Sequence, residues 1–404
     1  MIAADRPVQR SAESKLLYVD AAGQIQSVPR RSLVELLQPG DVVIANDAAT
    51  LPASLTGFHL QTGTEVEVRL AARSSLASGD VLRFNAVVFG PGDHRTRTED
   101  RALPPPLAPG QRLRFGSLTA VIETLLGHPR LVAMRFENSA ADVWAGLARH
   151  GRPIQYAHMP QALQLWDVWT PIAAQPVAYE PPSAGFALDW QLLSAFAAKG
   201  IVFATITHAA GISSTGDPEL DRLLPFDEPY RIPAATEKAL RRACREGRRA
   251  LAIGTTVVRA LEHSASRFGA VLAGEGVADQ RIGAHTPLRV VDAILSGTHE
   301  PGTSHYDLLQ AFVGERVLRR ADRVLEDGGF RTHEFGDSVL IERGSENYSS
   351  EARRCEADAI FATNARTGRA VGGAYTSRFL RTAANVVQEP GRLSSAGRLV
   401  GCSC

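Results

Sequence analysis

The residues with the clearest chemical potential surround a short turn within residues 250–262. Four apolar residues are followed by Gly254, and Thr255 and Thr256 then precede apolar residues at helical spacing. This order predicts a buried strand, a tight turn and the first turn of a helix. Such a turn directs free backbone N–H groups and two hydroxyls at one point, which suits a nucleotide or a carboxylate. Arg259, one helical turn later, could join them.

Three further polar residues stand where a sheet could present them to a ligand. His208 follows an apolar stretch at 201–207, and Asp47 follows another at 41–45. An imidazole titrates near neutral pH, so His208 could act as an acid or a base. Glu228 could take up a proton or bind an amine, and Asp47 could hold a ribose or a cationic group. A satisfied loop histidine, an exposed carboxylate and a strand-ending turn are the alternatives, as is a simple Arg259–Glu262 pair on one helix.

The composition is that of an ordinary globular protein. The chain has 404 residues, of which 44% are hydrophobic and 22% charged, and its net charge is +1. No run approaches the roughly 18 apolar residues of a membrane span, and the first residues lack a basic-then-apolar signal pattern. We expect a cytoplasmic protein with no membrane partner. A nucleic acid would have to be held by a local basic patch, because the chain has no global positive charge.

The periodicity of the chain divides it into two kinds of structure. From 57 to about 136, apolar and polar residues alternate between turns rich in Gly and Pro, which predicts a small antiparallel barrel. Elsewhere, strands alternate with helices. We therefore predict an α/β fold with a mostly parallel sheet, interrupted by an inserted small antiparallel β-barrel domain. The expected domains are 1–56 and 151–344 for the α/β part, 57–150 for the barrel, and 345–404 for a flexible or weakly packed tail.

Several motifs in order resemble one known family. The chain resembles the S-adenosylmethionine:tRNA ribosyltransferase-isomerase family of queuosine biosynthesis over about residues 6–343. The most specific motif is Gly-Thr-Thr-x-x-Arg-x-Leu-Glu at 254–262. The other matching motifs lie at 39–41, 46–47, 52–53, 182–185, 291–292, 299–301, 311–314 and 335–337. An inserted barrel in an α/β domain is also what the family has.

The resemblance implies a definite reaction. The family transfers the ribosyl group of S-adenosylmethionine to 7-aminomethyl-7-deazaguanine in the tRNA anticodon, isomerises the sugar, and releases adenine and methionine. The sulfonium acidifies the adjacent 5′ methylene, so a positioned base can remove a proton, and the departing adenine needs an acid. The site therefore needs a base, an acid, a clamp for the methionine carboxylate and an adenine slot. S-adenosylmethionine is the co-substrate, tRNA is the partner, and no metal is expected.

The resemblance also implies roles for the matching positions. The expected catalytic residues are His208, Glu228 and Asp47. The expected substrate-binding residues are Ser183, Gly185, Gly254, Thr255, Thr256, Arg259, His299 and Asp337. Arginines at 241–249 and 316–323 could contact tRNA phosphates, although ordinary solvated helix faces explain them as well.

The chain departs from the family in its loops. Two family arginines are absent, with Ala49 and Ser54 in their places, and Ala187 stands for an expected histidine. The loops at 210–214, 225–228 and 297–301 are also rewritten. Two alternatives therefore stay open, namely the same donor chemistry on an acceptor other than tRNA, and a non-catalytic nucleotide- or RNA-binding paralogue.

Overall fold

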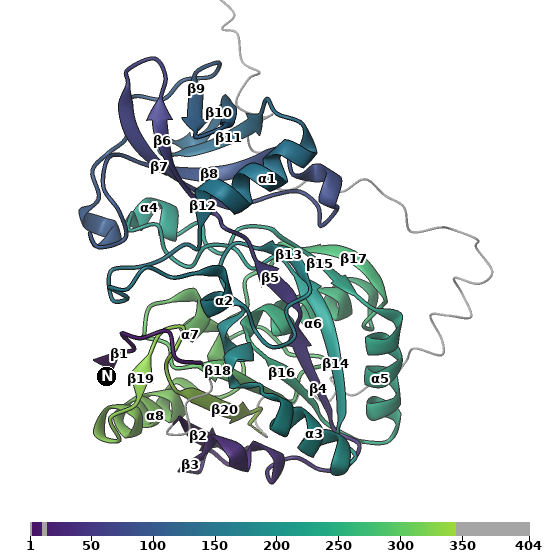
Figure 1. The fold of residues 1–404 in the computed structure, drawn as a ribbon. Coiled ribbons are helices and arrows are strands. Elements are labelled where there is room, and N and C mark those ends of the chain that lie inside the picture. Colours follow the sequence, from purple (N-terminus) through teal and green to yellow (C-terminus); the bar gives the residue numbers. More distant parts are fainter. Residues whose placement is uncertain (1, 10–13, 345–404) are drawn as a thin grey trace, which may run out of the picture.

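The structure, a computed structural model, describes residues 2–9 and 14–344. A large sheet covered by helices forms one part of the molecule, and a small barrel stands at one end of it (Figure 1). The tail expected at 345–404 lies outside the described residues. Within the described part of the chain, no helix combines the length and the apolar character that crossing a bilayer requires.

The large sheet has nine strands of mixed direction. Its strands in spatial order are β17 (Gly274–Ala278), β15 (Glu228–Ile232), β14 (Val202–His208), β4 (Val42–Asn46), β16 (Ala250–Ile253), β18 (Ala293–Gly297), β20 (Ser338–Glu342), β2 (Lys15–Val19) and β3 (Ile25–Pro29). Four of the eight neighbouring pairs are parallel, namely β14–β4, β4–β16, β16–β18 and β20–β2. The other four are antiparallel. The sheet is thus mixed, and the expectation of a mostly parallel sheet holds only for its central strands.

The central strands are buried on both faces because helices cover both. Along β4, Val42 and Ile44 join one apolar core, while Val43 and Ala45 join another on the opposite face. This is the period-two alternation of a strand whose two sides are both packed. The first face is covered by α5 (Ala234–Arg245), α6 (Thr255–Phe268) and α8 (Glu315–Asp327). The second face is covered by η1 (Arg30–Val34) and α3 (Trp190–Ala198).

The alternating segment forms a closed six-stranded antiparallel barrel, as predicted. Its strands in order are β6 (Ser54–His59), β7 (Thr64–Ala72), β8 (Arg83–Phe89), β11 (Leu131–Phe136), β10 (Leu118–His128) and β9 (Arg112–Phe115). Pairing of β9 with β6 closes the ring. Helix α1 (Ala140–His150) follows the last barrel strand, and Val143 and Leu147 join the barrel core. Closure removes the exposed strand edges that an open sheet would leave.

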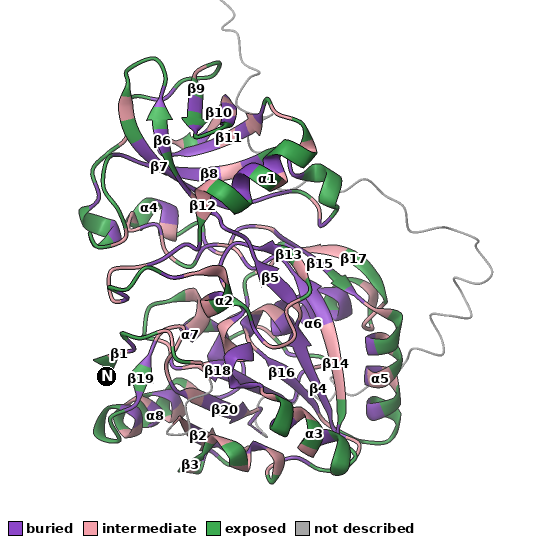
Figure 2. Ribbon diagram, viewed as in Figure 1, coloured by how far each residue is buried: buried purple, intermediate pink, exposed green. Residues whose placement is uncertain are grey.

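The barrel supports a loop of the α/β part. Its apolar core continues into Tyr179, Ile212 and Phe226, which lie outside the barrel strands. Phe84 meets Tyr179 edge to face, with ring centroids 6.3 Å apart. Figure 2 shows the resulting buried region between the barrel and the large sheet. The segment 209–227 is therefore held from the barrel side.

Short elements complete the described chain. They are β1 (Ile2–Ala3), β5 (Ala48–Thr50), β12 (Gly151–Arg152), β13 (Gln175–Ala178), β19 (Arg331–Thr332), α2 (Leu165–Val168), α4 (Pro218–Asp221), α7 (Ser304–Leu309), η2 (Ser78–Asp80), η3 (Thr98–Asp100) and η4 (Ser183–Ala187).

Candidate active site

A cavity that is open to solvent lies where the central parallel strands end. Residues that directly follow β16 line it, together with residues at the end of β18 and in the loop after β14. Open α/β sheets bind ligands at this edge. Of the residues expected from sequence, the cavity brings together Ser183, Glu228, Gly254, Thr255, Thr256, Arg259 and His299.

The turn between β16 and α6 has the strand–glycine–helix form that the sequence predicts. Gly254 has a φ of 93°, a backbone conformation that residues with a side chain rarely adopt. Its N–H donates to the Leu295 carbonyl at 2.8 Å, which ties the turn to the neighbouring strand β18. Thr255 and Thr256 open the helix, and the first N–H groups of a helix have no partner within it. The turn therefore offers donors to an anionic ligand in the cavity.

Arg259 and Glu228 form a buried ion pair in the cavity wall. Arg259 donates to the Glu228 carboxylate and, at 2.9 Å, to the Ala278 carbonyl. The other Glu228 oxygen accepts the Gly211 N–H at 2.5 Å. Burial lowers the pKa of Arg259 to about 10, so the guanidinium is still charged at neutral pH. The ion pair thus fixes two sides of the cavity.

The alternative pairing of Arg259 with Glu262 is wrong. The Glu262 carboxylate accepts the backbone N–H groups of 289, 290 and 291 at 2.7 to 2.9 Å. It therefore anchors the segment before β18.

His208 lies behind Glu228 and not on the cavity surface. Its side chain is fully buried, and its Nε2 is 3.5 Å from a Glu228 carboxylate oxygen. The Asn46 side chain holds the backbone of His208. Its amide N–H donates to the His208 carbonyl, and its oxygen accepts the His208 N–H, each at 2.9 Å. Burial, aided by the nearby Arg259 charge, keeps the pKa of His208 well below its usual value. Its imidazole is therefore neutral at neutral pH and touches the cavity only through Glu228.

Asp47 and Gly185 lie apart from the lining. The Asp47 carboxylate accepts hydrogen bonds from the hydroxyls of Thr205 at 3.0 Å and Thr207 at 2.7 Å. Gly185 is buried in η4, where an added Cβ would lie 2.9 Å from Thr170. Both residues support the neighbouring strands and loops.

Asp337 also lies outside the cavity. It accepts the N–H groups of Lys15 at 2.7 Å and Arg331 at 2.9 Å. It thereby closes the turn between β19 and β20, as a structural loop residue does.

Glu180 lines the cavity and was not expected from the sequence. Burial raises the pKa of its carboxyl to about 7, and the Tyr156 hydroxyl donates to it. A carboxyl that titrates near neutral pH can act as a general acid or base there. The only sequence signal was its position directly before the loop at 181–185, because periodicity and spacing do not report burial.

A pair of stacked imidazoles forms another part of the lining. The rings of His299 and His305 are 4.7 Å apart and nearly parallel, and Ser296 lies 2.9 Å from the His299 Nε2. Burial lowers the pKa of His305 to about 4 and that of His299 well below its usual value. His305 had no signal beyond following His299 by six residues. Two neutral imidazoles, a carboxyl that titrates near pH 7 and a helix N-terminus therefore share one cavity, which suits acid–base chemistry on an anionic ligand.

Comparison with known proteins gives one consistent result. A family model described as "Queuosine biosynthesis protein" matches residues 1–341. A protein of Sorangium cellulosum named S-adenosylmethionine:tRNA ribosyltransferase-isomerase is 32% identical over 358 residues, covering 84% of this chain and 94% of that protein. Proteins of the same name from Geobacter sulfurreducens and Thermus thermophilus are 31% and 30% identical, and cover 84% and 82% of this chain and 96% and 92% of their own lengths. A solved structure of S-adenosylmethionine tRNA ribosyltransferase from Thermotoga maritima aligns with a TM-score of 0.45 at 23% identity, over 84% of this chain and 96% of that one.

Proposed function

The chain belongs to the queuosine biosynthesis family, and on that premise we propose that it is an S-adenosylmethionine:tRNA ribosyltransferase-isomerase. It transfers the ribosyl group of S-adenosylmethionine to 7-aminomethyl-7-deazaguanine in tRNA and isomerises the sugar. The products are epoxyqueuosine in tRNA, adenine and methionine. The reaction itself needs no metal or redox cofactor, because the sulfonium supplies both the acidity and the leaving group. In this enzyme, the barrel is an inserted domain between the two parts of the α/β domain; it begins before the expected boundary at 57, because its strand β6 starts at Ser54, and the expected bounds 1–56, 57–150 and 151–344 are otherwise kept.

The donor is held by the turn at the start of α6. The methionine carboxylate binds the N–H groups and hydroxyls at Thr255 and Thr256, because a helix N-terminus favours an anion. The adenine lies against the prolines and Ile212 that line the same cavity. The Arg259–Glu228 pair keeps the wall between them in place.

Glu180 carries the proton transfers. With a pKa of about 7, its carboxyl exists in both forms at neutral pH. It can therefore remove a proton from the acidified methylene or protonate the departing adenine. The assignment rests on one observation, namely that the buried Glu180 carboxyl lines the same cavity as the helix N-terminus at Thr255 and Thr256.

His208 is a positioning residue for Glu228. It is fully buried and reaches the cavity only through that carboxylate. We assign Asp47, Gly185 and Asp337 to support of the surrounding backbone, and Ser183 and His299 to contact with the substrate.

A second candidate differs in its acceptor. The loops at 210–214 and 297–301, which depart from the family pattern, supply Gly211, Ile212, Ser213, Gly297 and His299 to the cavity lining. The departures therefore fall where an acceptor would be selected. The same donor chemistry on a small molecule or another RNA base follows from this observation.

The two candidates are separated by the release of adenine. Purified protein is incubated with S-adenosylmethionine, with or without tRNA that carries 7-aminomethyl-7-deazaguanine, and adenine and methionine are measured by chromatography. Release that requires this tRNA supports the first candidate, and release with another acceptor supports the second. If protein that binds the donor releases no adenine with any acceptor, both are wrong.

A further inference from the structure

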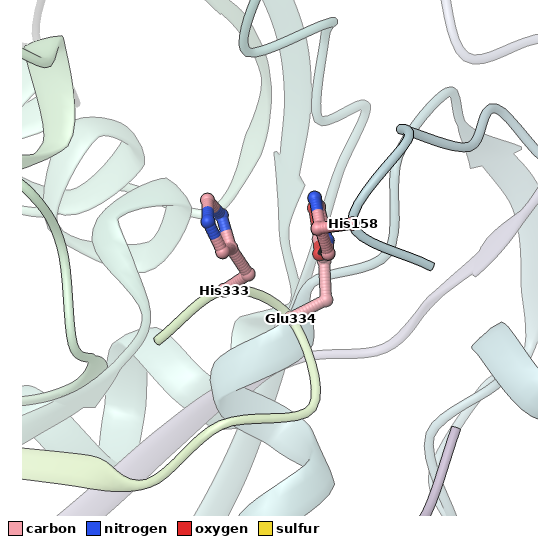
Figure 3. Close-up of side chains that lie close together, drawn as sticks. All are labelled: His158, His333 and Glu334. Atoms are coloured by element: carbon pink, nitrogen blue, oxygen red, sulfur yellow. Dashed lines mark hydrogen bonds and ion pairs between the residues drawn. The ribbon is translucent and has the colours of Figure 1, made fainter. Parts of the chain in front are cut away.

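A second group of chemically capable side chains lies beside the active-site cavity. It consists of His158, His333 and Glu334, whose ligand atoms all lie within 4.8 Å of one another. The His158 and His333 rings stack with centroids 4.1 Å apart, and the His158 Nε2 is 3.1 Å from a Glu334 oxygen. Figure 3 shows the two rings side by side, with Glu334 reaching His158 from the loop that also carries His333. Within residues 2–9 and 14–344, this is the one such His, Cys, Asp and Glu group.

The backbone at His333 is strained. Its φ is 68°, which makes it the one described residue other than glycine with a left-handed conformation. Such a conformation costs of order 1–3 kcal/mol and tends to persist where function requires it. It brings the side chains of two consecutive residues to the same partner, His158.

The two segments that carry the group are fixed against each other. Phe335 packs on the apolar cluster of Met159, Leu163 and Val168, which surrounds the His158 segment. Phe335 also stacks on Phe186 of η4, with centroids 5.2 Å apart. The separation of the three ligand side chains is therefore set by packing and not by the chance meeting of two free loops.

The nitrogen atoms of the His333 ring take part in no hydrogen bond among the described residues. The His333 ring makes a ring contact with His158, whereas the His158 ring also has Glu334 as a partner. None of the three side chains is fully buried, so an ion can enter from solvent. A stacked histidine pair would account for the ring contact alone, but not for the strain at His333 or for the converging carboxylate.

We propose that His158, His333 and Glu334 bind one divalent first-row transition-metal ion. Two imidazoles and one carboxylate form a ligand set for such ions, of which zinc is the simplest probe. In a tetrahedral site with metal–ligand distances of about 2.1 Å, two ligand atoms lie about 3.4 Å apart, so the group, whose atoms lie within 4.8 Å of one another, must close by up to about 1.4 Å. The two rings, which are now stacked within 13° of parallel, must also turn toward each other so that the lone pair of a nitrogen on each ring points at the ion.

The ion links the walls of the active-site cavity. His158 and Glu334 line a narrow pocket together with Glu180 and Pro181. Those two residues also line the active-site cavity. The ion therefore joins the segment that follows β12 to the turn before β20, directly behind Glu180.

Metal binding itself tests the proposal. Full-length protein without an affinity tag is stripped with EDTA, dialysed and titrated with Zn²⁺ by calorimetry and with Co²⁺ by visible absorption. We expect one ion per chain at micromolar or tighter affinity, and a Co²⁺ spectrum without a thiolate charge-transfer band. The variants His158→Ala, His333→Ala and Glu334→Gln each weaken binding by at least about a hundredfold, since changes around metal ligands alone cost 10- to 100-fold.

Two controls make the result decisive. His285→Ala, at an exposed histidine, must leave the affinity unchanged. Cys402→Ser/Cys404→Ser must also leave it unchanged, because thiols near the chain end could bind zinc. If the histidine variants fail to fold by circular dichroism, the near-isosteric Glu334→Gln decides. Binding only at millimolar metal, binding indifferent to all three variants, or binding that follows the cysteines would overturn the proposal.

Discussion

Replacing Glu180 with glutamine should change the pH dependence of stability in a defined direction. Burial raises the pKa of Glu180 in the folded protein to about 7 from its ordinary value of 4.5. Folding therefore favours the protonated carboxyl, whose stabilising effect is complete below pH 4.5 and is lost as the pH rises through 7. Glutamine keeps the shape and an acceptor for the Tyr156 hydroxyl but does not titrate.

The size of the effect follows from the shift. The rise of the Glu180 pKa from 4.5 to about 7 corresponds to roughly 3 kcal/mol. The free energy of unfolding of Glu180→Gln, relative to the unsubstituted protein, should rise by about 3 kcal/mol between pH 4.5 and pH 8. Most of this change should occur between pH 5 and pH 7, where the carboxyl would ionise in the unfolded chain but not in the folded one.

Urea unfolding across this pH range measures the difference directly. EDTA is present throughout, so that no bound metal changes the surroundings of the carboxyl. Glu65→Gln, at an exposed glutamate on β7, is the matched control and should show no comparable trend. A stability difference between Glu180→Gln and the unsubstituted protein that does not vary with pH would refute the assignment of a raised pKa.

Three further outcomes follow from the same geometry. Glu180→Gln should lower kcat by about a hundredfold or more, which is the usual contribution of a general acid or base. His208→Gln should lower kcat less than tenfold. A larger loss of kcat in His208→Gln than in Glu180→Gln, measured in steady-state assays, would contradict the assigned roles. Glu228→Gln leaves the buried Arg259 charge without its counter-ion and should cost about 3–5 kcal/mol in urea unfolding, most of which Glu228→Gln/Arg259→Met should restore; equal losses in both would show that the pair is not the cause. Gly254→Ala should cost about 1–3 kcal/mol because of its positive φ, and an unchanged unfolding midpoint would contradict that conformation.

Local patterns predicted the elements that have strong periodicity. The alternation from 57 to 136 identifies the barrel because one face of each strand must pack inside it. The apolar run, Gly254 and the threonines identify the β16–α6 turn for the same local reason. The mixed direction of the sheet was harder to predict, because the pairings of β20 with β2 and β18 and of β15 with β17 join segments far apart in the sequence.

The sequence predicted residues of the cavity lining only where a recognisable motif or a strand end contained them. Gly254, Thr255, Thr256, Arg259 and Glu228 lie together, as expected from one motif and a strand-adjacent carboxylate. The environment of each residue could not be read from the sequence, because burial depends on distant contacts. Thus His208 is enclosed behind the cavity wall, while Glu180, with no pattern around it, becomes the group that titrates near neutral pH.

The central claim is that the ribosyl carbons of S-adenosylmethionine reach a deazaguanine in tRNA. The most direct measurement uses S-adenosylmethionine with ¹³C in the ribose and tRNA that carries 7-aminomethyl-7-deazaguanine. Mass spectrometry of the digested tRNA should show a nucleoside that contains all five labelled carbons, with unlabelled adenine and methionine released in equal amounts. Label that stays in the donor, or that appears only in a small molecule, would contradict the claim.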